Sequence, residues 1–179
     1  MRKNLQKSSG FTLIELMIVI SIISILTAIA VPAVMNWLPT YRLNAAARDL
    51  YSNLQKARLQ AVKENNNIPI RFDTGVVPGF YYFDTNGDAA YTNGEFRIEL
   101  KNYNNDVDFK NPADSPSNNW NGNPCTQATV ITFNSRGTAN SGSIYFDNRL
   151  DDPNNNYCNA ITVRSTGSIK MRKYRVNWN

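Results

Sequence analysis

The sequence predicts an α+β protein in which one long N-terminal α-helix packs on an antiparallel β-sheet. Three observations along the 179 residues predict this fold: an almost uncharged apolar segment at Phe11–Val34, an amphipathic helical stripe after it, and then short runs of aromatic and β-branched residues. A chain of this length has room for one domain with an appendage. It contains no internal repeat and no linker that would mark a second domain.

The composition excludes several classes of enzyme and metal site. The chain has no histidine, so it has no Ser-His-Asp triad, no Cys-His pair and no His-ligated zinc. Its two cysteines cannot supply a four-thiolate site. The carboxylate pair Asp151-Asp152 lies in an Asn-rich segment with no base beside a nucleophile. We therefore expect a structural protein, not an enzyme, with no cofactor and no small-molecule substrate.

The first forty residues are strongly asymmetric in charge. Residues 1–10 carry three basic side chains and no acid, and Glu15 is the only charged residue from Ser8 to Tyr41. A helix of about 20 apolar residues is long enough to cross a bilayer. Basic residues in front of such a span predict a cytoplasmic N-terminus, so the rest of the chain would face the other side of the membrane.

Two ordinary interpretations compete for this segment. One is a secretory signal peptide, since Ala28-Ile29-Ala30 fits the small-x-small cleavage rule and would give a secreted globular protein starting at Val31. The other is a simple membrane anchor. Neither explains Glu15, because a carboxylate inside an apolar helix costs roughly 2.5–3.5 kcal/mol on insertion scales. Such a residue is a functional candidate whose expected partner is a cation.

The segment SSGFTLIEL, Ser8–Leu16, closely resembles the type IV prepilin signature. The resemblance implies that a prepilin peptidase removes a short leader at the cytoplasmic face, with Gly10 its last residue. Phe11 would then be the first mature residue and would be N-methylated, while the apolar segment is kept. Glu15 takes the position of the family's glutamate, and Pro32 matches a helix-kinking proline.

Cleavage after Gly10 would also give Glu15 a partner. It would free an α-amino group with a reference pKa of about 7.7–8.0. This group lies one helical turn from the carboxylate. The two charges can neutralise each other within one subunit or between neighbours, and they would mark the register when subunits pack by their helices.

Beyond Pro39 the pattern becomes amphipathic, with one apolar stripe at Leu43, Ala47, Leu50, Leu54, Ala57 and Ala61. We expect this stripe to pack on the protein's own sheet. The helix should end near Asn65–Asn67, with Pro69 beyond. From Leu13 to Glu64 it would hold about 52 residues and measure about 78 Å.

These patterns divide the chain into three parts. We expect a leader at residues 1–10, a transmembrane or filament-core helix at 11–38, and a head at 39–179. The head would consist of a helix at 39–66 and a sheet within 68–179.

The sheet is predicted from aromatic and β-branched runs between Asn, Gly, Pro and Ser turns. Lys101–Cys125 is rich in Asn and Pro and is expected to be mostly loop. The predicted strands are Ile68–Asp73, Phe80–Phe83, Phe96–Leu100, Val107–Phe109, Thr129–Phe133, Ser143–Phe146, Ala160–Arg164 and Ser168–Val176.

Two segments, Thr132–Asn148 and Ile161–Lys173, resemble the GspH/FimT family of minor pilins and pseudopilins. The resemblance implies a pilin-like fold and assembly with other pilin subunits into a type IV pilus or a type II secretion pseudopilus. It implies a single-pass protein of the bacterial inner membrane, with its head in the periplasm, that later joins a filament at the cell surface. The alternative is a DNA-binding minor pilin for natural DNA uptake.

A weak metal motif occurs between the predicted strands Phe80–Phe83 and Phe96–Leu100. Asp84, Asn86, Asp88 and Glu95 occupy positions 1, 3, 5 and 12 of an EF-hand spacing. However, Ala89 replaces the glycine needed at position 6, and the flanks are predicted strands. Asn, Asp and Gly are also ordinary turn residues. We therefore expect a loop without calcium.

Cys125 and Cys158 would both face an oxidising periplasm under the predicted topology. A disulfide between them would close a loop of about 34 residues and could contribute roughly 3–4 kcal/mol in the chain-entropy model. The alternative is two reduced thiols; we expect the disulfide.

The C-terminal segment carries the cations Lys170, Arg172, Lys173 and Arg175, with Tyr174 among them and Trp178 after them, and could hold a phosphate backbone. We expect a solvated strand face instead. On a strand, the first two would point to one face and the last two to the other. Some FimT-type minor pilins bind DNA through a Gly-Arg-x-Arg motif, but here Ser168 follows Gly167.

Overall fold

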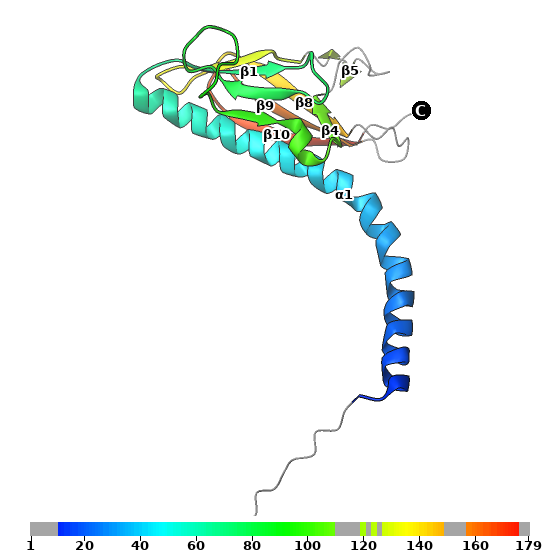
Figure 1. The fold of residues 1–179 in the computed structure, drawn as a ribbon. Coiled ribbons are helices and arrows are strands. Elements are labelled where there is room, and N and C mark those ends of the chain that lie inside the picture. Colours follow the sequence, from blue (N-terminus) through cyan, green and yellow to red (C-terminus); the bar gives the residue numbers. More distant parts are fainter. Residues whose placement is uncertain (1–10, 110–118, 121–122, 125–126, 149–156, 176–179) are drawn as a thin grey trace, which may run out of the picture. The chain divides into compact units, whose positions relative to one another are not determined.

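A computed structural model describes residues 11–109, 119–120, 123–124, 127–148 and 157–175. The structure contains two compact units, Met1–Leu38 and Pro39–Asn179. One helix, α1 (Leu13–Glu64), contributes residues to both units and begins at the residue that the sequence predicts (Figure 1).

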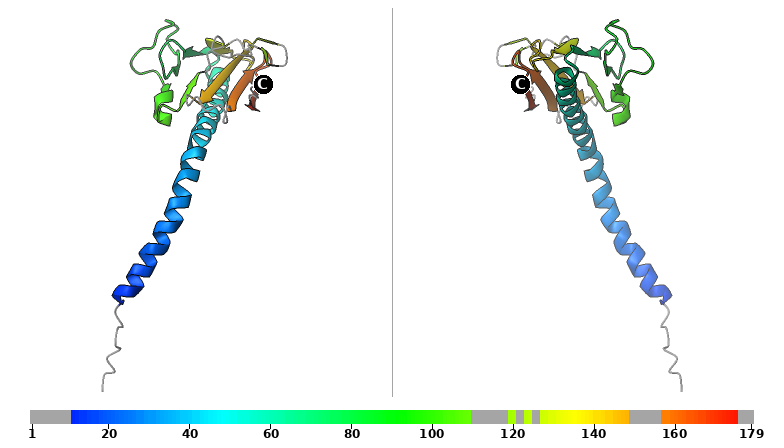
Figure 2. Two further views of the ribbon diagram at one scale, coloured as in Figure 1. Left: turned by 90° about the vertical axis from the view of Figure 1, so that its right-hand side faces the viewer. Right: turned by 90° about the vertical axis from the view of Figure 1, so that its left-hand side faces the viewer.

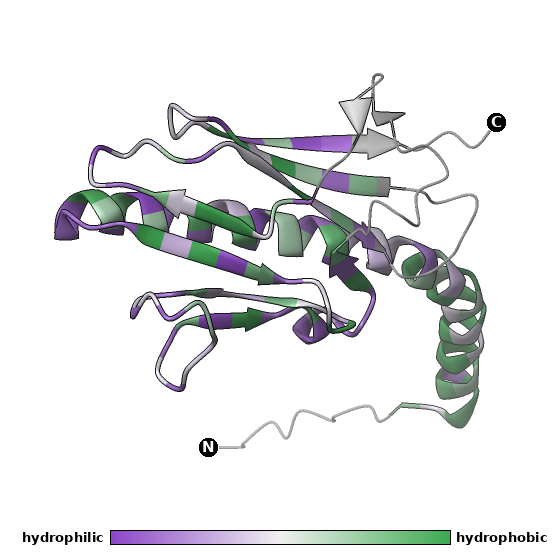
Figure 3. Cartoon of the chain, turned by 90° about the horizontal axis from the view of Figure 1, so that it is seen from above, coloured by the Kyte–Doolittle hydropathy of each residue, from purple (hydrophilic) through white to green (hydrophobic). Residues whose placement is uncertain are grey.

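In the N-terminal unit, which the structure describes from Phe11 onward, the chain forms the apolar first part of α1. Every residue from Phe11 to Asn36 is exposed. Hydrophobic colouring covers most of this part of α1 in Figure 3. In the second half of α1, hydrophilic and hydrophobic residues alternate around the helix. By length and composition, α1 is able to cross a membrane.

In the head, the second half of α1 lies along one side of the strands (Figure 2). The predicted apolar stripe forms the contact, since all six of its side chains are fully buried: Leu43, Ala47, Leu50, Leu54, Ala57 and Ala61. This packing of an amphipathic face, and not helix propensity alone, stabilises the second half of α1.

The helix ends in a Schellman motif two residues earlier than the predicted bound at residue 66. Asn65 takes the left-handed conformation, with φ of 49°. The N–H of Asn66 donates to the carbonyl of Ala61 at 3.1 Å, and the N–H of Asn65 donates to that of Val62 at 3.4 Å. These bonds satisfy two of the carbonyls that every helix leaves unpaired at its C-terminus.

The strands form two four-stranded antiparallel sheets, not the single sheet that the sequence predicts. The first has the order β3-β2-β1-β7, and its strands are β1 (Ile68–Asp73), β2 (Phe80–Phe83), β3 (Arg97–Glu99) and β7 (Val130–Phe133). The second has the order β10-β9-β8-β4, and its strands are β4 (Val107–Phe109), β8 (Gly142–Asn148), β9 (Tyr157–Val163) and β10 (Ile169–Arg175). The α+β class is confirmed.

Two short elements lie where the sequence predicts a strand end and a loop. A 3₁₀ helix, η1 (Leu100–Tyr103), takes the last residue of the predicted strand Phe96–Leu100. Asn104 then turns the chain in a left-handed conformation, with φ of 60°. A two-stranded pair, β5 (Asn119–Trp120) and β6 (Asn123–Pro124), lies inside the predicted loop.

Alternation along the strands places the core between α1 and the two sheets. In β1 the buried and half-buried side chains alternate, as a sheet with one face on the core requires. Both sheets and α1 contribute to one hydrophobic cluster, whose largest fully buried side chains include Leu50, Tyr81, Phe133, Phe146 and Ile161.

Candidate functional site

The start of α1 has a local capping contact that the sequence analysis missed. The Thr12 side-chain oxygen accepts a hydrogen bond from the N–H of Glu15 at 3.3 Å. The pair has the Thr-x-x-Glu spacing of a capping box, which is the signal that could have revealed it. Glu15 itself is exposed in the single chain. Gly10, the predicted last residue of the leader, lies outside the described residues. Pro32, the predicted kink residue, lies within α1.

The hydroxyl groups within the apolar half of α1 are satisfied by the helix itself. Ser21, Ser24 and Thr27 each donate to the carbonyl four residues earlier, at 2.7 Å. Such bonds allow hydroxyl residues to lie in an apolar environment without an unpaired donor. Glu15 differs from these hydroxyl residues, because it is the only charged residue of this segment.

Polar contacts fix the part of α1 where the head begins. The Arg42 guanidinium forms an ion pair with Asp106, and the Tyr103 hydroxyl donates to the Asp49 carboxylate. Burial raises the pKa of Tyr103, and the hydrogen bond and negative charge of Asp49 raise it further. In β9, the Asn159 amide donates to the carbonyl of Leu43 at 3.4 Å. These contacts tie η1, the residue before β4 and strand β9 to the same turns of α1.

The calcium candidates are engaged in holding their own loop. Asp84 is fully buried and accepts bonds from Arg71 Nε at 2.6 Å, from the N–H of Gly87 at 2.6 Å and from that of Ala89 at 3.2 Å. Glu95 accepts from the N–H groups of residues 85 and 92, at 2.9 and 3.0 Å.

Asn86 bonds to Asp88. In the part of the chain that the structure describes, no cluster of His, Cys, Asp and Glu could hold a metal ion. The arrangement is that of a hydrogen-bonded turn, in which Asp84 and Glu95 bind backbone N–H groups of their own loop.

The buried Asp84 predicts a loss of stability in acid. Burial raises the pKa of its carboxyl, but the bonds from Arg71, Gly87 and Ala89 lower it by more, so the pKa lies below its ordinary value. Because the folded-state pKa is depressed, the stabilisation is complete above about pH 4 and is lost as the pH falls through the folded-state pKa.

In the wild type, the free energy of unfolding should fall between about pH 6 and pH 2 as Asp84 is protonated. We expect this slope to be smaller in Asp84→Asn, as measured by urea titration at each pH. Asp88→Asn, in the exposed part of the same loop, is the control and should keep the wild-type slope. An unchanged slope in Asp84→Asn would contradict this assignment.

The disulfide prediction is not tested by the structure. Cys125 lies outside the described residues, and Cys158 is buried in β9. Their pairing stays a prediction.

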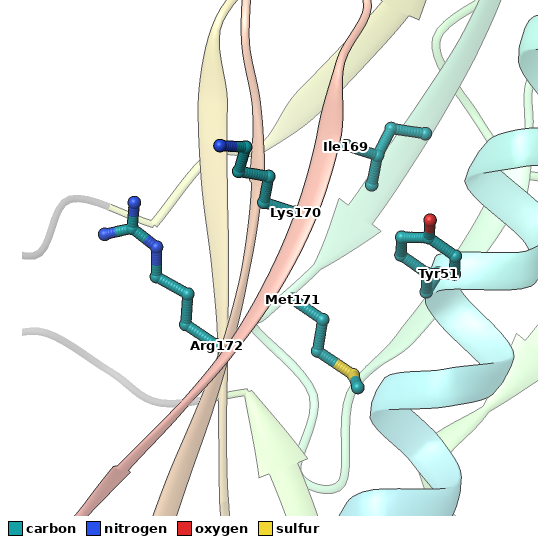
Figure 4. A pocket seen from close by; sticks show the side chains of 5 residues that line it. All are labelled: Tyr51, Ile169, Lys170, Met171 and Arg172. Atoms are coloured by element: carbon teal, nitrogen blue, oxygen red, sulfur yellow. The ribbon is translucent and has the colours of Figure 1, made fainter.

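The basic residues of the C-terminal segment lie on β10, the outermost strand of its sheet. Figure 4 shows Lys170 and Arg172 pointing away from α1, whereas Ile169 and Met171 point toward it. Lys173 is exposed. The side chain of Arg175 lies outside the described part of the chain.

Comparison with known proteins identifies relatives for both parts of the chain. The family model for type II transport protein GspH matches residues 46–167, and the model for the prokaryotic N-terminal methylation motif matches residues 5–31. Pilin-like protein PilA1 of Thermus thermophilus is 34% identical over 87 residues, which are 48% of this chain and 54% of that protein. The chain thus spans about half the length of this relative.

A solved structure is also similar. The minor pseudopilin EpsH from the type 2 secretion system of Vibrio cholerae has a TM-score of 0.47 and 14% sequence identity to this chain. The match covers 73% of this chain and 96% of the EpsH chain.

Proposed function

The chain belongs to the type II transport protein GspH family, whose model matches residues 46–167, and from this premise we propose that it is a structural minor pilin or pseudopilin. It would assemble through α1 into a type II secretion pseudopilus or a type IV pilus. Its role would be assembly and not catalysis, without a cofactor or a small-molecule substrate.

One observation carries the proposal. The N-terminal methylation motif at residues 5–31 and the GspH match at residues 46–167 each overlap one part of α1 (Leu13–Glu64), and the residues of that helix up to Trp37 are exposed. An apolar helix without protein around it requires a bilayer or other apolar helices. A subunit that is first inserted in a membrane and then packs by its helix in a filament would have an apolar environment for α1 in both states.

Glu15 is the residue that we assign to assembly. Cleavage by a prepilin peptidase after Gly10 would leave a methylated, cationic amino group on Phe11, one helical turn from Glu15. In a bundle of apolar helices, this cation on a neighbouring subunit would neutralise the carboxylate. Pro32 would allow α1 to bend as helices pack, because a proline removes one helical hydrogen bond.

The same proposal places the protein in the cell. The basic residues at positions 2, 3 and 7 would keep the N-terminus in the cytoplasm, and α1 would cross the inner membrane once. The head would face the periplasm until the subunit is drawn into the filament. Its partners would be the prepilin peptidase, the inner membrane and other pilin subunits.

The DNA-binding alternative has less in its favour. Its candidate cations include Lys170 and Arg172, which share one face of β10. Two cations on one face can neutralise few phosphates, which predicts weak binding with a shallow dependence on salt. We therefore do not propose DNA uptake as the function.

The mass of the processed protein tests the proposal. In a host that expresses a prepilin peptidase, we expect the chain to lose residues 1–10 and to gain one methyl group. The variant Ala30→Leu, which destroys the small-x-small site, should be processed in the same way, and a host without the peptidase should yield the uncleaved chain. A mature protein that starts at Val31 would refute the proposal.

A further inference from the structure

The strand β10 presents a long free edge. It pairs with β9 in an uninterrupted register from Ile169 opposite Val163 to Arg175 opposite Tyr157. It contains neither proline nor glycine, and it is the outermost strand in its sheet order. A free edge of this kind carries unpaired N–H and C=O groups and can pair with another chain.

The other sheet edges in the described part of the chain are shorter or covered. β3 and β4 have three residues each. The edge of β7 is capped by Asn140, whose amide donates to the carbonyl of Val130 at 3.0 Å and accepts from the N–H of Thr132 at 2.6 Å. β10 is thus the edge best suited to accept an added strand.

The ladder with β9 fixes which backbone groups of β10 point outward. The N–H of Arg164 donates to the carbonyl of Ser168 at 2.9 Å, just before β10 begins. Because hydrogen-bonded and non-bonded pairs alternate in an antiparallel ladder, Ile169, Met171 and Lys173 belong to non-bonded pairs. Their N–H and C=O groups therefore point to the free edge.

A groove lies beside this edge. It has a volume of about 410 Å³ and is lined by Tyr51 of α1 and by Ile169, Lys170, Met171 and Arg172 of β10. Figure 4 shows that Ile169 and Met171 point to the side of Tyr51, while the two cations point to the opposite side. Met171 is 39% exposed. The edge therefore has an apolar side and a basic side.

The charge of the strand selects the partner. Lys170, Arg172 and Lys173 lie on β10, and neither β9 nor β10 contains an acidic residue. A second copy of this chain paired edge to edge would bring like charges together, which is unfavourable across a strand pair. An acidic strand would have opposite charges in the same positions.

We propose that β10 accepts an extended acidic segment of a partner protein as an additional strand. The segment would alternate apolar and acidic residues, the apolar ones entering the groove beside Tyr51 and Met171, and the acidic ones lying on the face of Lys170. Backbone hydrogen bonds would supply affinity, and the two faces would supply specificity. This inference goes beyond assembly through α1 and does not depend on the role of Glu15.

The test uses the full chain in detergent micelles and a labelled, capped peptide in which Val and Glu alternate over about eight residues, within the usual length of a strand. We expect saturable binding by fluorescence anisotropy. A peptide with Lys in place of Glu should bind at least about tenfold more weakly. No binding of the Val/Glu peptide would overturn the proposal.

Met171→Pro removes an outward N–H but no bond to β9, and proline is tolerated at a free edge. It should weaken peptide binding at least about tenfold, whereas Met171→Leu, which keeps both the N–H and the apolar groove, should bind as the wild type does. Wild-type binding by a folded Met171→Pro would overturn the proposal. Displacement of the peptide by a DNA oligonucleotide would assign the edge to DNA and overturn the proposal. Self-association of the chain that Met171→Pro abolishes would assign the edge to a second copy and would also overturn the proposal.

If Met171→Pro does not fold, Lys170→Glu decides the matter. It replaces a cation of the basic face by a carboxylate and should remove most of the preference for the Val/Glu peptide, whereas an unchanged preference would overturn the proposal. Because peptide binding is measured without filament assembly, a failure here leaves the proposed function untouched.

Discussion

Gly167→Ala is expected to lower the free energy of unfolding by about 2–5 kcal/mol, from backbone strain and from a steric clash together. Gly167 lies in the turn between β9 and β10, with φ of +76°, a conformation that residues with a side chain rarely adopt. A Cβ atom at this position would lie 1.9 Å from the carbonyl oxygen of Gly137. That oxygen also accepts a bond from Arg58 Nε at 2.9 Å, so it cannot move without breaking a contact with α1.

Gly87→Ala is the matched control for this experiment. Gly87 has nearly the same φ, +77°, but no atom lies within 4 Å of the place that an added Cβ would occupy. It should lose about 1–2 kcal/mol, the cost of the left-handed conformation alone. Urea unfolding of both variants in the same detergent measures the difference. Equal losses would show that the two turns move apart at little cost.

Glu15→Ala is expected to reduce incorporation into filaments at least about hundredfold while leaving cleavage and membrane insertion intact. In an assembled bundle, removing Glu15 would leave the amino group of a neighbouring Phe11 as a buried, unpaired charge. Such a loss costs about 3–5 kcal/mol, and each 1.4 kcal/mol is a factor of about ten. Insertion itself should improve slightly, because the carboxylate no longer has to enter the bilayer.

Recovery of the variant with sheared filaments, relative to its amount in the membrane, measures this effect. Glu64→Ala is the control, since Glu64 is at the exposed end of the same helix and bonds to Gln60 at 3.0 Å. It should be incorporated as the wild type is. Wild-type incorporation of Glu15→Ala would show that the carboxylate does not pair subunits.

Most of the helix could be predicted from local patterns. The apolar run, the spacing of Leu43 to Ala61 and the Asn residues after Glu64 act through contacts between near neighbours in the sequence, and the observed bounds follow them. Thr12 is the exception. Its capping bond to Glu15 was not predicted, although Thr and Glu three residues apart are a local signal for such a bond.

The site residues divide along the same line. The spacing of Asp84, Asn86, Asp88 and Glu95 suggests a metal loop, but the structure uses Asp84 and Glu95 to bind backbone N–H groups and Arg71. A spacing pattern lists which oxygens are available, and only the folded loop determines which of them are already bonded.

Local patterns are enough to predict the order of helix and strands, the alternating faces of β10 and the prepilin-like start of the chain, because each depends on residues only a few positions apart. They do not predict that the strands divide into two sheets, that the turns at Gly137 and Gly167 meet, or that Tyr51 lies beside the free edge of β10. These features join residues that are far apart in the chain. They depend on steric fit and on hydrogen-bond pairing between distant segments when α1 packs on both sheets. Patterns among near neighbours in the sequence do not contain this information.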